Sequence, residues 1–173
     1  MSDTLITIIA IALAAILMFV FPLMTMADRA DSASQLTVQQ AVTDFVEKAS
    51  TTGKITKANY DKMIETITST GNTYDVELSV QVKDSNLGKK ASLAQPDKIG
   101  ENVYYVLYNQ QILDIIEKSD TYFCKEGDIV TASAKNTNPT ISDQLKNFFY
   151  TVTGNNTASI TSEHTAMVTA NGK

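Results

Sequence analysis

Residues 4–27 read TLITIIAIALAAILMFVFPLMTMA and contain no charged side chain. A helix of about 20 residues crosses the hydrocarbon core of a bilayer, so this run is long enough to span one. In lipid the backbone must satisfy its own hydrogen bonds, which favours a helix here despite the β-branched residues. The sequence therefore predicts a transmembrane anchor over residues 1–27, with the lipid bilayer as its first partner.

A cleaved signal peptide is the competing interpretation of this run. The residues before it, Met1-Ser2-Asp3, carry an acid where a signal peptide carries Lys or Arg, and the run exceeds the usual apolar length of about 7–15 residues. Thr25-Met26-Ala27 loosely imitates a cleavage site made of small residues. That last feature favours cleavage, whereas the acid and the length of the run favour a retained anchor.

Pro22 lies inside the run, where it removes one backbone donor and is expected to bend the helix near Met18. One interpretation is a proline tolerated by a membrane helix, and the other is a bend that sets how the helix packs in an assembly. Helices associate in lipid through close packing, which small side chains allow. Such side chains are supplied by Ala10, Ala12, Ala14 and Ala15, which would also suit a lone anchor.

An amphipathic helical stem is expected over residues 28–53, where Gly53 provides a stop signal. The helix either continues unbroken from the membrane to Thr52 or breaks in the polar residues 28–34. Unbroken, it would be about 70 Å long at 1.5 Å per residue. Apolar residues with three-and-four spacing form a stripe that must pack against its own domain or a neighbouring subunit: Leu36, Val38, Ala41, Val42, Phe45, Val46 and Ala49.

Residues 54–173 predict an α+β domain. Thr56 suits an N-cap for a helix that Gly71 ends. The buried face of that helix is expected to contain Tyr60, Met63, Ile64 and Ile67. From Tyr74 to Val82 apolar and polar residues alternate strictly, which indicates a half-buried strand. A long polar loop follows at residues 84–101.

The second part of the domain continues the mixed pattern. Residues 103–107 suit either a strand or the start of a helix that continues to residue 116. Gly127 and Asp128 mark a turn before a strand at residues 130–134. Asn138 as cap and Pro139 in the first turn predict a helix over residues 139–152, closed by Gly154. A threonine-rich strand is expected at residues 158–168. One apolar face per element predicts a small antiparallel sheet of about three strands, covered on one side by helices.

No catalytic constellation is visible, and no catalytic residue, metal site, cofactor or small-molecule substrate is expected. None of the motifs GxxxxGK[ST], GxGxxG, GxSxG or HExxH occurs. His164, the only histidine, is interpreted as a surface or edge residue, and Cys124 as structural. For Tyr104, Tyr105 and Tyr108, core packing is favoured over a ligand platform. These features favour a structural role over an enzyme.

The chain has a formal net charge of −5 and a sequence pI of about 4.8. Nucleic acid is not expected as a partner, because its recognition needs clustered Lys and Arg. Arg29 is the only basic residue near either end of the apolar run, and Asp28 and Asp31 flank it. Charge therefore does not determine the membrane orientation.

Four stretches in a fixed order carry a family resemblance: Phe21-Pro22 ending the apolar run; Gly53 to Thr56 with Tyr60, leading to Thr70-Gly71-Asn72-Thr73-Tyr74; Tyr104-Tyr105 before Gln111-Ile112-Leu113-Asp114; and Gly127-Asp128 before Lys135-Asn136-Thr137-Asn138. The chain resembles pilin-like membrane proteins, TadE-like or pseudopilin-like, of tight-adherence and type II secretion-like systems in Gram-positive anaerobes. The resemblance implies a single-pass cell-membrane protein whose extracytoplasmic domain sits on a helix that packs into a pilus or pseudopilus base.

The same resemblance implies self-association, or association with related subunits, through the N-terminal helix. Candidate assembly or structural residues are Ala10, Ala14, Pro22, Gly53, Tyr60, Gly71, Tyr74, Gly127 and Asp128. Unlike ordinary type IV pilins, the sequence has neither a basic leader ending in glycine before the apolar run nor a glutamate early in it. A minor or base-associated subunit is therefore expected.

Two further hypotheses stay open. A membrane-tethered extracellular ligand-binding or sensory module would use residues 84–101, with Tyr104 and Tyr108 lining a cavity beneath the sheet. A cryptic enzyme would need His164 and Cys124 to converge with an acid in a concave site.

Overall fold

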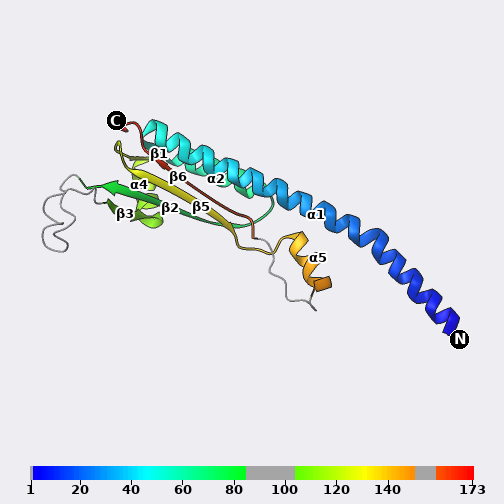
Figure 1. Ribbon diagram of the computed structural model, residues 1–173. Coiled ribbons are helices and arrows are strands. Elements are labelled where there is room, and N and C mark those ends of the chain that lie inside the picture. Colours follow the sequence, from blue (N-terminus) through cyan, green and yellow to red (C-terminus); the bar gives the residue numbers. More distant parts are fainter. Residues whose placement is uncertain (1, 85–103, 151–158) are drawn as a thin grey trace, which may run out of the picture.

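One continuous helix forms the first third of the chain. The computed structural model describes residues 2–84, 104–150 and 159–173, and its helix α1, Ser2–Thr52, runs for 51 residues through Pro22 and residues 28–34. At 1.5 Å per residue this helix is about 77 Å long. Its N-terminal half projects away from the other elements, whereas its C-terminal half lies along them (Figure 1). Of the two alternatives for residues 28–34, the unbroken helix is confirmed. A bend at Pro22 stays a prediction.

The domain is built on a four-stranded antiparallel sheet in the order β3-β2-β5-β6. Val80 lies opposite Leu107 on one side and Val130 on the other, and Ala132 lies opposite His164. The strand alternative for residues 103–107 is thus confirmed over its described part. The strands are β2, Tyr74–Lys83; β3, Tyr104–Tyr108; β5, Ile129–Asn136; and β6, Thr161–Met167.

Helices cover one face of this sheet. The C-terminal half of α1 contacts β5 and β6. Helix α2, Lys57–Thr68, packs on α1, and helix α4, Asn109–Ser119, contacts β2 and β3. A second sheet pairs β1, Lys54–Thr56, with β4, Thr121–Phe123. It was not predicted, because three residues are too few to show a period. Helix α5, Ile141–Tyr150, follows β5 along the chain. The α+β class, with helices over one side of an antiparallel sheet, is confirmed.

A single hydrophobic core joins the C-terminal half of α1 to the sheet. Leu36 is the one member of the predicted stripe that stays outside it, because its side chain is 67% exposed. The core on the side of β2 and β5 consists of Val76, Leu78, Val80, Val82, Val130, Ala132 and Ala134. Helix α1 contributes Val38, Ala41, Val42, Phe45, Val46 and Ala49, and α2 contributes Met63 and Ile67. Part of the proposed stem is therefore core of the domain.

Polar side chains attach α1 along the outer strand β6. The amide of Gln35 pairs with the backbone of Thr161 in both directions: Nε2 donates to the carbonyl over 2.7 Å, and Oε1 accepts from the N–H over 3.0 Å. Ser50 Oγ donates to the carbonyl of Met167 over 2.6 Å. These contacts satisfy backbone groups of β6, which is an edge strand of the sheet that the described residues form.

The structure corrects two sequence expectations. Helix α5 is not capped by Asn138 with Pro139 in its first turn; it begins at Ile141, and Thr140 precedes it as cap. The Asn138 side chain instead accepts from the backbone N–H of Thr73 over 2.7 Å. This bond holds Asn138 in the connection between β5 and α5. The expected ends of this helix at Val152 and Gly154, and the loop at residues 85–101, lie outside the described residues.

The second correction concerns the tyrosines of β3. Tyr105 and Tyr108 are 48% and 67% exposed, and Tyr104 is half-buried, so core packing is wrong for them. Leu107, opposite Val80, takes the core face, and period two turns Tyr104 and Tyr108 to the other face. The hypothesis of a cavity beneath the sheet lined by Tyr104 and Tyr108 is not supported, because both side chains lie on the face opposite the one that carries the core.

Candidate functional site

The N-terminal half of α1 is the most unusual surface of the described chain. Its most apolar stretch of 18 residues has a mean hydropathy of 2.9, and no residue of that stretch is buried. Met18 and Phe19, for example, are 73% and 69% exposed. A continuous apolar surface of this kind marks an interface with lipid or protein. The chain therefore has one N-terminal helix long and apolar enough to span a membrane.

Two hydroxyl groups within this half are satisfied by the backbone of the helix itself. Thr7 Oγ1 donates to the carbonyl of Asp3 over 2.7 Å, and Thr25 Oγ1 donates to the carbonyl of Phe21 over 3.0 Å. An unpaired hydroxyl in hydrocarbon would cost several kcal/mol, on the order of the lost hydrogen bond in an apolar solvent. Both threonines thus suit an apolar surrounding without needing a partner helix.

Three of the predicted assembly residues lie on this half. Ala10 and Ala14 are exposed and four residues apart, so they share one face of the helix, and Pro22 is exposed two turns further on. The structure brings none of the three into contact with the domain core. They are available to a bilayer or to another helix.

Helix α5 meets α1 where the apolar run ends. Thr140 and Asp143 form a reciprocal cap at its start: the N–H of Thr140 donates to Asp143 Oδ2, and the N–H of Asp143 donates to Thr140 Oγ1, each over 3.1 Å. The Thr140 hydroxyl then donates to Asp31 Oδ2 on α1 over 2.6 Å. One side chain therefore both starts α5 and attaches it to α1.

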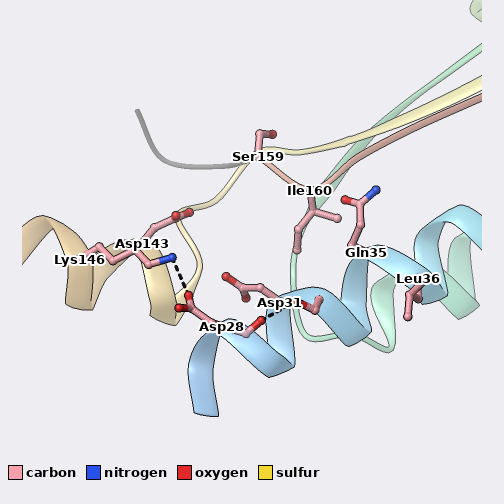
Figure 2. Close-up of a pocket in the computed structure, with 9 residues that line it drawn as sticks. Asp28, Asp31, Gln35, Leu36, Asp143, Lys146, Ser159 and Ile160 are labelled. Atoms are coloured by element: carbon pink, nitrogen blue, oxygen red, sulfur yellow. Dashed lines mark hydrogen bonds and ion pairs between the residues drawn. The ribbon is translucent and has the colours of Figure 1, made fainter. Parts of the chain in front are cut away.

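A second attachment lies one turn closer to the N-terminus of α1. Lys146 Nζ forms an ion pair with Asp28 Oδ1 at 2.6 Å (Figure 2). Ser142 Oγ donates to the same oxygen. The hydrogen bonds that Asp28 accepts from Lys146 and Ser142 lower the pKa of Asp28. The same bond between Lys146 and Asp28 raises the pKa of Lys146. The pair is about half exposed, and such pairs contribute only about 0.2–1 kcal/mol. Its main effect is to position α5.

A groove of about 600 Å³ follows this junction, and its lining includes Asp28, Asp31, Gln35, Asp143 and Lys146. Each of its three carboxylates already accepts from one of the partners described above: the Lys146 ammonium, a hydroxyl group or the backbone N–H of Thr140. Within the described residues, no group of three or more His, Cys, Asp or Glu side chains is placed to hold a metal ion. The arrangement is that of a joint between two helices.

Gly53 joins the end of α1 to the C-terminal segment. It has a φ of +66°, and its N–H bonds the carbonyl of Ala49 as a helix cap. A Cβ here would lie 2.3 Å from the carbonyl oxygen of Ala170 and 2.5 Å from the nitrogen of Gly172. Gly53 is therefore required by both its dihedral angle and this close approach.

Asp128 is a buried structural carboxylate, 1% exposed. Its side chain accepts from the N–H groups of Lys83 over 3.0 Å and Lys125 over 2.8 Å, while its carbonyl accepts from Val168. It thus joins the ends of β2, β5 and β6. Gly127 beside it has a φ of +92°, as its predicted turn requires.

The other predicted residues hold helix α2 in place. Tyr60 makes an edge-on ring contact with Phe45 of α1, with centroids 6.4 Å apart. Tyr74 shares a hydrogen bond of 2.8 Å with Thr70 at the end of that helix. Gly71, with a φ of +82°, has no neighbouring atom within 4 Å of the position that a Cβ would take. These residues act within the fold.

Cys124 and His164 do not converge on a site. Cys124 is 2% exposed, and burial, with a smaller contribution from Asp128, raises its pKa to about 12, so it stays a thiol. His164 lies on the edge strand β6, as expected, and its Nε2 pairs with Glu47 Oε1 of α1 at 2.9 Å. That contact is another attachment of α1 to the sheet.

The sheet face that the described helices leave uncovered carries a groove of about 850 Å³. Its walls include the acids Asp75, Glu77 and Glu163, and the exposed ring of Tyr108. This groove lies on the opposite side of the sheet from the helices, because its residues alternate with the core residues of β2 and β5.

Comparison with models of known protein families gives no match for this sequence, and neither do comparisons with curated proteins and with solved structures. The function is therefore argued from the chain itself. Sequence reasoning identified the apolar run and its small residues but missed the junction of Asp28, Asp31, Thr140 and Lys146. One local signal was present: Thr140 and Asp143 have the spacing of a capping box.

Proposed function

We propose that this chain is a non-enzymatic, single-pass membrane subunit whose extracytoplasmic domain joins a pilus or secretion apparatus through α1. The observation that carries the proposal is the division of α1. One half exposes apolar side chains, and the other half is core of the domain, without a break between them. A rigid connection of this kind transmits the packing of the membrane helix directly to the domain.

The family resemblance supports the kind of assembly. It implies a domain carried on a helix that packs with self or related subunits, and α1 offers Ala10 and Ala14 on one face for such packing. The apolar run has no glutamate near its start, unlike the run of ordinary type IV pilins, and this difference favours a minor or base-associated subunit. The same resemblance supports an extracytoplasmic domain at the cell membrane.

Cysteine crosslinking in native membranes tests this assembly. Ala10→Cys and Ala14→Cys are expected to give disulfide-linked species on mild oxidation. Ala12→Cys, which points to the other side of the helix, is expected to give less of them. The native Cys124 does not interfere, because it is buried and its pKa is raised to about 12. Monomers alone at every position would contradict assembly through α1.

A membrane-tethered binding module is the second candidate function, and the groove on the uncovered sheet face favours it. Tyr108 and the neighbouring acids would then contact the ligand. This alternative predicts that Tyr108→Ala abolishes activity in the cell while crosslinking through α1 is unchanged. A subunit that only assembles would tolerate that substitution at an exposed side chain.

A further inference from the structure

Helix α5 lies at the level where α1 leaves its apolar run. A groove of about 540 Å³ lies between α1, the start of α5 and the connections at residues 70–72 and 138–139. Its apolar lining includes Leu23, Met26 and Ile141, and its other side carries polar residues such as Asn72 and Asn138. Leu23, Met26 and Ile141 are 53%, 69% and 68% exposed, so they form one apolar surface shared by two helices. Figure 1 shows α5 beside α1, nearer the N-terminus than the sheet is.

The junction fixes α5 at this level. Asp28 binds Lys146 and Ser142, and Asp31 binds Thr140, so two consecutive turns of α1 are attached to the start of α5. Contacts on two turns prevent α5 from sliding along α1. The depth of α5 relative to the apolar run is therefore set by the fold.

We infer that the first turn of α5 is immersed in the boundary between acyl chains and headgroups of the bilayer that α1 spans. This inference rests on the proposed membrane anchor. Residues 4–27 extend about 36 Å as a helix, against a hydrocarbon core of about 30 Å, so Leu23 and Met26 lie near one edge of that core. Ile141, in the same groove, lies at that edge too.

The polarity along the junction agrees with this depth. Ile141 lies in the same groove as Leu23 and Met26, whereas the half-exposed pair of Asp28 and Lys146 begins where the uncharged run ends. Charged groups at the ends of a membrane segment belong at the headgroup level, and apolar side chains of an interfacial helix lie below it. The partner of this surface is thus lipid, and α5 sets how close the domain sits to the membrane.

Tryptophan quenching tests the inference, since the chain contains no tryptophan. Single variants of the full chain are placed in phosphatidylcholine vesicles whose lipids carry bromine either near the headgroup or deep in the chain. Ile141→Trp is expected to lose fluorescence mainly to the shallow bromines, and Gln144→Trp in the same groove serves as a second reporter. Leu17→Trp marks the membrane helix, and Tyr105→Trp on β3 marks the distant part of the domain.

The controls separate the two levels of the proposal. Quenching of Leu17→Trp and Ile141→Trp, but not of Tyr105→Trp, would support an interfacial α5. Quenching of Leu17→Trp alone, with neither α5 reporter affected, would overturn the inference and leave the anchor intact. An unquenched Leu17→Trp would overturn the anchor and, with it, the inference. Because Ile141 is exposed, tryptophan there displaces no core side chain, which circular dichroism of the variant checks.

Discussion

Gly53 carries a structural demand that no other residue type meets. Its positive φ costs a residue with a Cβ about 1–2 kcal/mol, and the backbone of Ala170 and Gly172 occupies the space of that Cβ. We expect Gly53→Ala to lower the free energy of unfolding by about 3 kcal/mol or more, combining the strained dihedral angle with overpacking. Chemical denaturation in detergent measures this loss.

Gly71 provides the matched control. It also has a positive φ, of +82°, but open space surrounds its Cβ position. Gly71→Ala should therefore lose only about 1–2 kcal/mol, from the dihedral angle alone. If Gly53→Ala lowers the free energy of unfolding no more than Gly71→Ala does, the close approach of the C-terminal segment to Gly53 does not contribute to stability.

Cys124 should be inert while the domain is folded. Its pKa rises from the ordinary value of 9.0 to about 12, and the thiolate is the reactive form. At pH 8 we expect maleimide to label the folded protein about a thousandfold more slowly than the unfolded chain. Because folding favours the protonated thiol, its contribution to stability is present below pH 9.0 and is lost as pH rises toward about 12. Equal labelling rates in both states would refute the burial of this thiol.

At the scale of elements, the cap of α5 combines a local and a distant role. Thr140 satisfies an N–H of α5 and donates to Asp31 of α1. Thr140→Ala should cost about 1–2 kcal/mol and raise amide exchange throughout α5, because it removes the cap and the attachment together. Thr140→Ser keeps both hydrogen bonds and should exchange like the wild type. If serine fails to restore protection, the hydroxyl is not what holds α5.

The elements that sequence predicted are those with many repeats of one period. Strand β2 shows strict alternation over its length, and the stripe of α1 from Val38 to Ala49 is long enough to fix a helix face. Strands β1 and β4 have three residues each, which is too short for any period. The sequence pattern places the start of α5 two residues early, because Asn138 and Pro139 also suit the start of a helix. The actual role of Asn138 depends on its hydrogen bond with Thr73, which is distant in the sequence.

The candidate site divides in the same way. Ala10, Ala14 and Pro22 follow from composition and position in the apolar run alone. The bond between Asp28 and Lys146 was not predictable, because it joins residues that are far apart in sequence and depends on how α5 docks. Gln35 and Glu47 had no sequence signal either, since a polar residue on an amphipathic helix normally faces water.

For the whole molecule, the decisive feature is that one helix serves two surroundings. Residues 28–173 contain the full core, whereas residues 54–173 lack the six buried side chains that α1 contributes from Val38 to Ala49. We expect a chain starting at residue 28 to fold with a cooperative thermal transition in water, and a chain starting at residue 54 to remain unfolded. Folding of the shorter chain would show that the C-terminal half of α1 is only a stem.

The most direct test of the account follows residues 4–27 in cells. Membranes are washed with alkaline carbonate, and the intact mass of the retained protein is measured. We predict that the chain stays in the membrane pellet and still contains residues 4–27. A soluble polypeptide that begins near Asp28 would contradict the anchor on which the account depends.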